Sequence, residues 1–145
     1  MYVETILKTK GRDVALAKPD ETVAEAARRL ADRGIGALVV SADGRTPIGI
    51  LSERDIARAV AEHGEGLAAL SVRSLMSAGV ITCTPEDTID SLMATMTERR
   101  IRHLPVMRDG RLAGVVSIGD VVKYRLDEME QETEALREYI GGAIA

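Results

Sequence analysis

Two short segments of the sequence carry the same chemically useful pair of side chains. The segments Gly49–Asp55 and Gly114–Asp120 read GILSERD and GVVSIGD, so each places a serine three residues before an aspartate. A helix that begins at such a serine offers free backbone N–H groups, which are suited to binding phosphate. The nearby carboxylate can accept hydrogen bonds from both hydroxyl groups of a ribose. The spacing therefore makes each segment a candidate binding site for a phosphorylated sugar.

The same spacing also has a purely structural explanation. Ser52 and Ser117 could be helix N-caps, with Asp55 and Asp120 bonding back from the first turn. Their negative charge would also suit the helix dipole. On spacing alone we favour the capping interpretation, because such motifs are common. The two interpretations are compatible, since a capping serine can still face a cleft.

The repetition extends well beyond these two motifs. Shifting the chain by 66 residues aligns Pro19 with Pro85, and the same shift aligns Asp43-Gly44-Arg45 with Asp109-Gly110-Arg111. One residue is then missing in the second copy, and the offset becomes 65 for the Ser and Asp of the motifs. This many matches with one deletion in a turn indicates a tandem duplication of about 60 residues.

Each copy predicts the same order of elements, a strand, a helix, a hairpin and a second helix. The T-x-x-E pattern of Thr22 and Glu25 predicts a capping box at the start of the first helix. Asp-Gly between apolar runs is a strong hairpin signal. Antiparallel hairpins beside helices predict an α+β fold. The expected strands are 13–17, 37–41, 48–52, 79–83, 103–107 and 112–117, and the expected early helices are 23–32 and 89–99.

With these features the chain resembles a pair of cystathionine β-synthase (CBS) domains. The resemblance rests on GILSERD, GVVSIGD, the linker VRSLM at 72–76 and RIRHLPVMRDG at 100–110, and it covers about residues 3 to 125. It implies two β-α-β-β-α repeats packed with pseudo-twofold symmetry. It also implies a regulatory module, and not an enzyme, that binds AMP, ADP, ATP or S-adenosylmethionine in clefts between the repeats.

The resemblance assigns roles to particular residues. In the family pattern the aspartate binds the ribose hydroxyls and the serine assists, which here names Ser52 with Asp55 and Ser117 with Asp120. With these roles added to the duplication, we favour ligand binding over capping alone. Basic residues before the middle strand meet phosphates in some relatives. That role would fall to Arg102 and His103, with Arg54 as a further phosphate ligand. The alternative for Arg102 and His103 is a solvated strand end, and the sequence favours neither.

The first repeat has Gly36 and Ala37 where the second has Arg102 and His103, so we expect unequal clefts. Without Trp or Phe, an adenine ring would need an aliphatic cage with backbone hydrogen bonds. The residues expected to form this cage lie near the first strand of each repeat: Ala17 and Lys18, and Cys83 and Thr84.

Composition argues against several other classes. The formal net charge of −4 and the lack of a dense basic run argue against nucleic-acid binding. Cys83 is the only cysteine, so neither an internal disulfide nor a multi-cysteine metal site is expected. We see no secretory signal, no membrane-length apolar run and no catalytic triad. We therefore expect a cytoplasmic protein that is not an enzyme and has no membrane association.

The predicted organisation is repeat 1 with the N-terminal segment at 1–65, repeat 2 at 66–125, and a C-terminal helix over 118–142. This helix has apolar residues spaced 4, 3, 4, 3 and 4, which is a heptad seam. We expect Gly141-Gly142 to end it. One alternative is a helix that lies on its own domain, but the resemblance to CBS pairs, which often dimerise, favours a seam that joins two subunits in a homodimer. The seam residues are Val122, Leu126, Met129, Thr133, Leu136 and Ile140.

The sequence thus predicts a stand-alone sensor of an adenosine-containing ligand that signals to a protein partner in trans. The alternative is a ligand-independent dimerisation or protein-interaction module, in which the two motifs serve only as helix caps. The sequence identifies neither the partner nor which adenosyl ligand is preferred.

Overall fold

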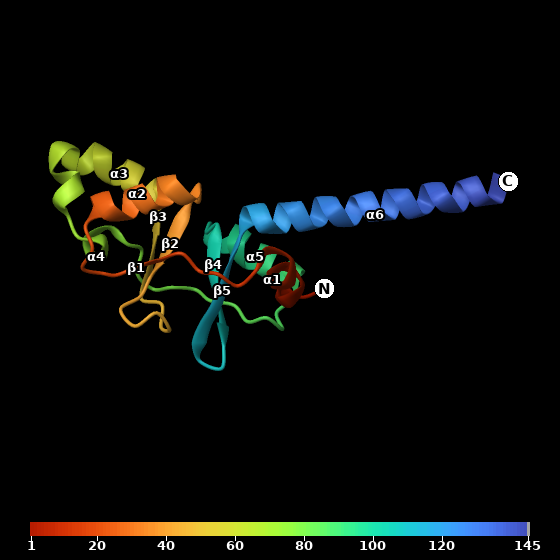
Figure 1. Ribbon diagram of the computed structural model, residues 1–145, viewed down its shortest axis with the longest axis horizontal. Coiled ribbons are helices and arrows are strands. Elements are labelled where there is room, and N and C mark those ends of the chain that lie inside the picture. Colours follow the sequence, from red (N-terminus) through yellow and green to blue (C-terminus); the bar gives the residue numbers. More distant parts are fainter. Residues whose placement is uncertain (145) are drawn as a thin grey trace.

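The computed structural model describes residues 1–144 and contains two α+β repeats followed by a long helix (Figure 1). The elements are α1 (Val3–Lys10), β1 (Leu16–Ala17), α2 (Val23–Arg33), β2 (Ala37–Val40), β3 (Gly49–Ser52), α3 (Glu53–His63), the 3-10 helix η1 (Gly64–Ala69), α4 (Val72–Leu75), α5 (Ile89–Arg99), β4 (His103–Arg108), β5 (Arg111–Ser117) and α6 (Ile118–Ile144). In residues 1–144 no helix is long and apolar enough to cross a membrane.

The predicted hairpins are present in both repeats. Strands β2 and β3 pair antiparallel with Ala37 opposite Ser52, and β4 and β5 pair antiparallel with His103 opposite Ser117. The Asp109-Gly110 turn has positive φ at both residues, as a tight hairpin turn requires. The two sheets therefore carry the motif serines at equivalent positions, each across from the start of the neighbouring strand.

The first strand of each repeat is shorter than predicted. In repeat 1 only Leu16–Ala17 pairs with β2, in parallel, and in repeat 2 only Cys83 forms an isolated bridge to Val106. The predictions 13–17 and 79–83 are therefore too long. In repeat 1 the bonds to β2 begin at Ala15, whose carbonyl accepts a bond from the Val39 N–H at 3.0 Å.

The helix predictions are close to the structure, with two corrections. The Thr22 hydroxyl accepts a bond from the Glu25 N–H at 3.2 Å, but within residues 1–144 no bond from the Thr22 N–H to the Glu25 carboxylate completes the capping box. Helix α6 does not stop at Gly141-Gly142 and continues to Ile144. Glycine lowers helix propensity by only about 1 kcal/mol, which an otherwise favourable long helix tolerates.

The hydrophobic core of each repeat includes a segment that precedes the other repeat in the sequence. The first core cluster combines Val3, Ile6 and Leu7 of α1 with buried residues of repeat 2, such as Leu92 of α5. A second cluster combines Val72 of α4 with the buried residues of repeat 1. The N-terminal segment thus packs on repeat 2, and the linker between the repeats packs on repeat 1.

Backbone hydrogen bonds show that this exchange is symmetric. The Val3 N–H donates to the Asp87 carbonyl at 2.9 Å, and the Val72 N–H donates to the Glu21 carbonyl at 2.8 Å. Since Glu21 and Asp87 are 66 residues apart, the two contacts are the same contact in the two repeats. The exchange ties the repeats into one folded unit with an internal pseudo-twofold axis.

Candidate functional site

Each motif serine ends a strand and caps the helix that follows. The Ser52 hydroxyl accepts a bond from the Asp55 N–H at 3.2 Å, and the Asp55 carboxylate accepts one from the Ser52 N–H at 2.9 Å. Ser117 and Asp120 make the matching bonds at 3.1 and 2.8 Å. The capping interpretation of both motifs is therefore confirmed. The remaining oxygen of Asp55 accepts a bond from the Ser77 hydroxyl at 3.2 Å.

The motif glycines are required by the exchanged segments. A Cβ built on Gly49 would lie 2.5 Å from the Met76 sulfur, and one built on Gly114 would lie 2.8 Å from a methyl carbon of Leu7. Real Cβ atoms do not approach other atoms so closely. Glycine at these positions lets the exchanged segment pack against the strand that leads into the motif. It therefore helps to position the serine and aspartate that follow.

One cleft, which we name the Asp55 cleft, has a volume of about 730 Å³ and is built from both repeats. Ser52 and Asp55 come from repeat 1, and the segment Arg100–His103 comes from repeat 2. The start of α6 closes one side through Ile118 and Gly119. The remaining lining residues are Gly36, Ile50, Glu53, Arg54, Ala57, Arg58, Ser77 and Ser117.

A second cleft of about 490 Å³, the Asp120 cleft, is its pseudo-symmetric counterpart. Ser117 and Asp120 come from repeat 2, and the segment Gly34–Ala37 comes from repeat 1. The remaining lining residues are Lys10, Asp13, Ala15, Arg33, His103 and Val115. Each cleft thus combines the serine and aspartate of one repeat with the strand entry of the other.

The two clefts differ in charge. The Asp55 cleft is lined by four arginines and two carboxylates, whereas the Asp120 cleft has two cations and two carboxylates. The arginines are Arg54, Arg58, Arg100 and Arg102. They come from two separate parts of the chain, 54–58 and 100–102, so the sequence alone does not show that they share one cleft. The Asp55 cleft is therefore the more electropositive of the two.

In the Asp120 cleft the carboxylate is already paired within the chain. The Lys10 ammonium donates to the Asp120 carboxylate at 2.7 Å and to the Val115 carbonyl at 2.8 Å. Burial raises the pKa of Asp120, but the Lys10 ammonium and the Ser117 backbone N–H outweigh burial and lower this pKa overall. Asp120 is therefore ionised and pairs with Lys10 through one carboxylate oxygen, whereas within residues 1–144 Asp55 has no lysine partner.

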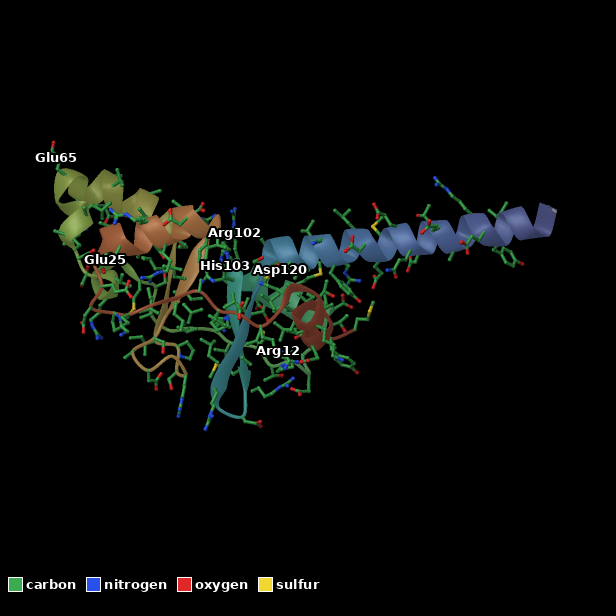
Figure 2. All side chains as sticks on the ribbon, in the orientation of Figure 1. Arg12, Glu25, Glu65, Arg102, His103 and Asp120 are labelled. Carbon is green, nitrogen blue, oxygen red and sulfur yellow. The ribbon has the colours of Figure 1, made fainter. Side chains whose placement is uncertain are left out.

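His103 lies between the clefts and lines both of them. Figure 2 shows Arg102, His103 and Asp120 gathered where the two repeats meet, near the start of α6. Burial lowers the pKa of His103 below 6.5, against the opposing effect of Asp120 and Glu53. The imidazole is therefore mainly neutral at pH 7 and can accept as well as donate a hydrogen bond.

Arg100 occupies a backbone conformation that normally favours glycine. Its φ is 54°, in the left-handed region, where it forms the C-cap of α5. The equivalent position in repeat 1 is Gly34, with a φ of 62°. A non-glycine residue in this region costs about 1–2 kcal/mol. Arg100 also lines the Asp55 cleft.

The residues proposed as an adenine cage lie apart from these clefts. Ala17 and Lys18 line a separate hollow of about 480 Å³ beside the Asp43 turn, and Ala17 is buried. Cys83 is buried in the core of repeat 2, where burial raises its pKa to about 12. The Thr84 N–H bonds to Asp87 at 2.8 Å. None of these four residues lines the Asp55 cleft or the Asp120 cleft.

Sequence reasoning missed several residues that the structure places in the clefts. Lys10 was not considered, because it precedes the repeat and reaches Asp120 only through the exchange of α1. Arg58 follows Arg54 by one helical turn, a spacing that could have identified it. Arg100 is marked in the sequence only by its alignment with Gly34 at the end of a helix.

Comparison with known proteins agrees with this architecture. The model of the CBS domain family matches residues 6–62 and 72–127. The mitochondrial CBS domain-containing protein CBSX3 of Arabidopsis thaliana is 34% identical to the chain, over 97% of the chain and 72% of CBSX3.

Solved structures show the same fold. The CBS-domain containing protein ATU1752 from Agrobacterium tumefaciens is 47% identical, with a TM-score of 0.83 over 86% of this chain and 99% of that one. The CBS domain pair of protein MJ0100, solved in complex with 5′-methylthioadenosine and S-adenosyl-L-methionine, is 25% identical, with a TM-score of 0.77 over 88% of this chain and 98% of that one. The chain therefore belongs to the CBS domain family, and its fold is a tandem CBS pair.

Proposed function

We propose that the protein is a cytoplasmic regulatory sensor, and not an enzyme, that binds an adenosine-containing ligand in the Asp55 cleft. It acts as a homodimer and signals to a partner protein in trans. One observation carries the proposal: the Asp55 carboxylate from one repeat shares a cleft with a cationic segment from the other. The complex of the relative MJ0100 with two adenosyl compounds supports an adenosyl ligand in general.

In this proposal different residues of the Asp55 cleft bind different parts of the ligand. The Asp55 carboxylate accepts hydrogen bonds from the ribose hydroxyls, and Ser52 supports it through the capping box. Arg102 and Arg54 bind phosphate, assisted by the N-terminal end of α3. Neutral His103 adds a hydrogen bond near the same group. Ala17, Lys18, Cys83 and Thr84 do not line this cleft, so in this proposal they are not assigned a contact with the ligand.

The charge of the Asp55 cleft favours AMP, ADP or ATP over S-adenosylmethionine. The side chains that line it carry four positive and two negative charges. A phosphate chain would be attracted to the arginines, and bidentate guanidinium–phosphate pairs add geometric specificity. The sulfonium centre of S-adenosylmethionine is a cation, which the same arginines would repel.

A ligand in this cleft would report its presence by bridging the two repeats. It would contact Asp55 on repeat 1 and Arg102 on repeat 2 at the same time. Binding can shift a conformational equilibrium only through different affinities for the two states. A bridging ligand has such a difference, because it binds best when the two repeats hold the spacing that satisfies both ends.

The alternative function is a ligand-independent interaction module. The observation that favours it is that the chain itself satisfies both capping boxes, so neither motif needs a ligand to be explained. The two functions differ in what the loss of Asp55 would do. In the alternative, removing its carboxylate would weaken only the fold.

Calorimetric titration of the stripped protein with AMP, ADP, ATP and S-adenosylmethionine tests the proposal. We expect Asp55→Ala to lower nucleotide affinity at least about tenfold, because a charge-assisted contact is worth about 1.5–3 kcal/mol. Thr88→Ala is the matched control, since Thr88 caps α5 outside both clefts. Both variants should lose about 1 kcal/mol of stability, but only Asp55→Ala should lose affinity.

Two results would contradict the proposal. If the native protein gives no heat with any of the four ligands, the motifs are caps and the alternative function holds. If Asp55→Ala and Thr88→Ala bind equally well, the ligand occupies some other site. Urea unfolding of both variants shows whether each remains folded at the temperature of the titration.

A further inference from the structure

Helix α6 presents a row of exposed apolar side chains to solvent. The helix projects well beyond the rest of the molecule (Figure 1). On one face Val121 is buried, and Arg125 forms ion pairs with Asp90 and with Glu128. The centre of the apolar row lies about a quarter turn from the centre of this face. Its members and their exposed fractions are Val122 51%, Leu126 57%, Met129 61%, Leu136 59% and Ile140 48%.

The row has the geometry of a coiled-coil seam. Its spacing of four and three residues places Leu126, Thr133 and Ile140 at a positions, and Met129 and Leu136 at d positions. Thr133 does not interrupt the seam, because its hydroxyl bonds to the Met129 carbonyl of the same helix at 2.9 Å. The seam can therefore pack against another helix without leaving that hydroxyl unsatisfied.

The charges that flank the seam favour a second copy of α6 as the partner helix and indicate its direction. The e positions hold Lys123, Glu130 and Arg137, and the g positions include Arg125 and Glu132. In a parallel pair of identical helices, each g residue faces the e residue of the next heptad on the other helix. Arg125, which also pairs with Asp90 and Glu128 of its own chain, would then lie beside Glu130 of the second copy, and Glu132 would face Arg137 of the second copy. Both pairs attract.

An antiparallel pair with full overlap gives the opposite result. Full overlap places Val122 opposite Ile140 of the second copy and Leu126 opposite Leu136. Glu130 and Glu132 then each lie near their own counterpart, and Lys123 lies near Arg137. All three contacts repel, so the flanking charges favour the parallel arrangement.

We propose that α6 pairs with α6 of a second copy as a parallel, in-register, two-stranded coiled coil. The proposal deepens the homodimer of the proposed function and does not depend on ligand binding. It places the two Asp55 clefts at the same end of the coil, because Ile118 and Gly119 at the start of α6 line that cleft. A change in either cleft would therefore act at the base of a shared helix pair.

Disulfide trapping in the full chain tests the direction of the pair without any nucleotide. Leu136→Cys should form a disulfide-linked dimer under mild oxidation, because equivalent d positions lie opposite each other in a parallel coil. In the antiparallel pair these residues are ten apart along the seam, about 15 Å, which is too far for a disulfide. The native chain is the control, since Cys83 is buried and its raised pKa of about 12 leaves it unreactive.

A mixture of two cysteine variants distinguishes an antiparallel pair from a parallel pair. An equimolar mixture of Leu126→Cys and Leu136→Cys chains, one carrying a mass tag, should give only same-variant disulfides if the pair is parallel. Disulfides mainly between the two variants would establish the antiparallel pair and overturn the proposal. The absence of any disulfide, together with a monomeric mass in sedimentation, would overturn it as well.

Sedimentation of charge variants tests the flanking pairs. Arg137→Glu should raise the dimer dissociation constant about tenfold, because two symmetry-related attractions become repulsions. Adding Glu132→Arg to that variant should restore the native dissociation constant. An antiparallel pair would instead be strengthened by Arg137→Glu alone, because a repulsion with Lys123 is removed.

A charge placed in the seam should separate the chains. Leu136→Asp should raise the dissociation constant at least about a hundredfold, because pairing would bury two carboxylates. Gln131→Asp adds the same charge on the opposite side of the helix and should leave the dimer intact. If Leu136→Asp still sediments as a dimer at low concentration, α6 is not the joint.

Discussion

At the scale of single residues, the Asp55 cleft includes a side chain whose backbone conformation lowers the stability of the fold. This residue is Arg100, which adopts a left-handed φ of 54° where repeat 1 uses Gly34. This conformation lowers the stability of the fold, whereas we propose that the Arg100 guanidinium raises the affinity of the cleft for phosphate. A single substitution can therefore separate them.

We expect Arg100→Gly to leave stability unchanged or raise it by up to about 1 kcal/mol, because glycine adopts this φ without strain. The same variant should lose about tenfold in affinity for ADP or ATP, since it removes one guanidinium from the cleft. Urea unfolding and calorimetry measure the two effects. Arg99→Ala is the control, because Arg99 carries the same charge but does not line the cleft. A destabilised Arg100→Gly with unchanged affinity would show that Arg100 serves the fold.

The sequence predicted some of these residues and not others for a physical reason. Ser52 and Asp55 were identifiable because a duplicated short-range pattern encodes them, and Arg102 because it aligns with a glycine. Arg58 and Arg100 required the path of the chain, since they reach the cleft from a helix face and from a helix end. A cluster of charges assembled across two repeats leaves no local signal in the sequence.

At the scale of elements, the exchange of α1 and α4 explains more of the motif than ligand binding does. The motif glycines are close-packed against Met76 and Leu7, which arrive from segments that precede the opposite repeat. The sequence predicted the helices and hairpins because their signals are local. It assigned the N-terminal segment to repeat 1 because chain order was the only guide. The packing partner of an eight-residue helix is set by tertiary contacts alone.

We expect Gly114→Ala to destabilise the protein by about 1–3 kcal/mol, because the new methyl group overlaps the buried Leu7 side chain. Gly66→Ala is the matched control, since a Cβ there meets nothing within 4 Å. Urea unfolding of both variants measures the difference. Equal midpoints for the two variants would mean that α1 shifts freely, and the exchange would then contribute little to the core.

At the scale of the whole molecule, the pseudo-twofold fold has two clefts of different character. The Asp55 cleft is electropositive, and its carboxylate has no lysine partner. In the Asp120 cleft, Lys10 pairs with Asp120 at 2.7 Å. This difference arises from the exchange, because α1 extends beyond the position where the shorter α4 ends. The two clefts are therefore unequal although the fold is symmetric. The sequence predicted this inequality from Gly36 and Ala37, and the Lys10–Asp120 pair is a second reason for it.

The prediction that follows concerns stoichiometry. The Lys10 ammonium pairs with the Asp120 carboxylate and competes there with a ribose hydroxyl, so we expect the native chain to bind one nucleotide, in the Asp55 cleft. Lys10→Met removes the competing cation and should raise the calorimetric stoichiometry to two per chain. It should cost no more than about 1 kcal/mol of stability, since the ion pair is partly exposed to solvent.

Two further variants assign each binding event to a cleft. Lys8→Met removes a lysine from the exposed side of the same helix and should keep a stoichiometry of one. Adding Asp120→Ala to Lys10→Met should abolish the second event and leave the first. A native stoichiometry of two, or a Lys10→Met chain that still binds one nucleotide, would show that Lys10 does not control access. The two clefts would then differ only through the arginines that line the Asp55 cleft.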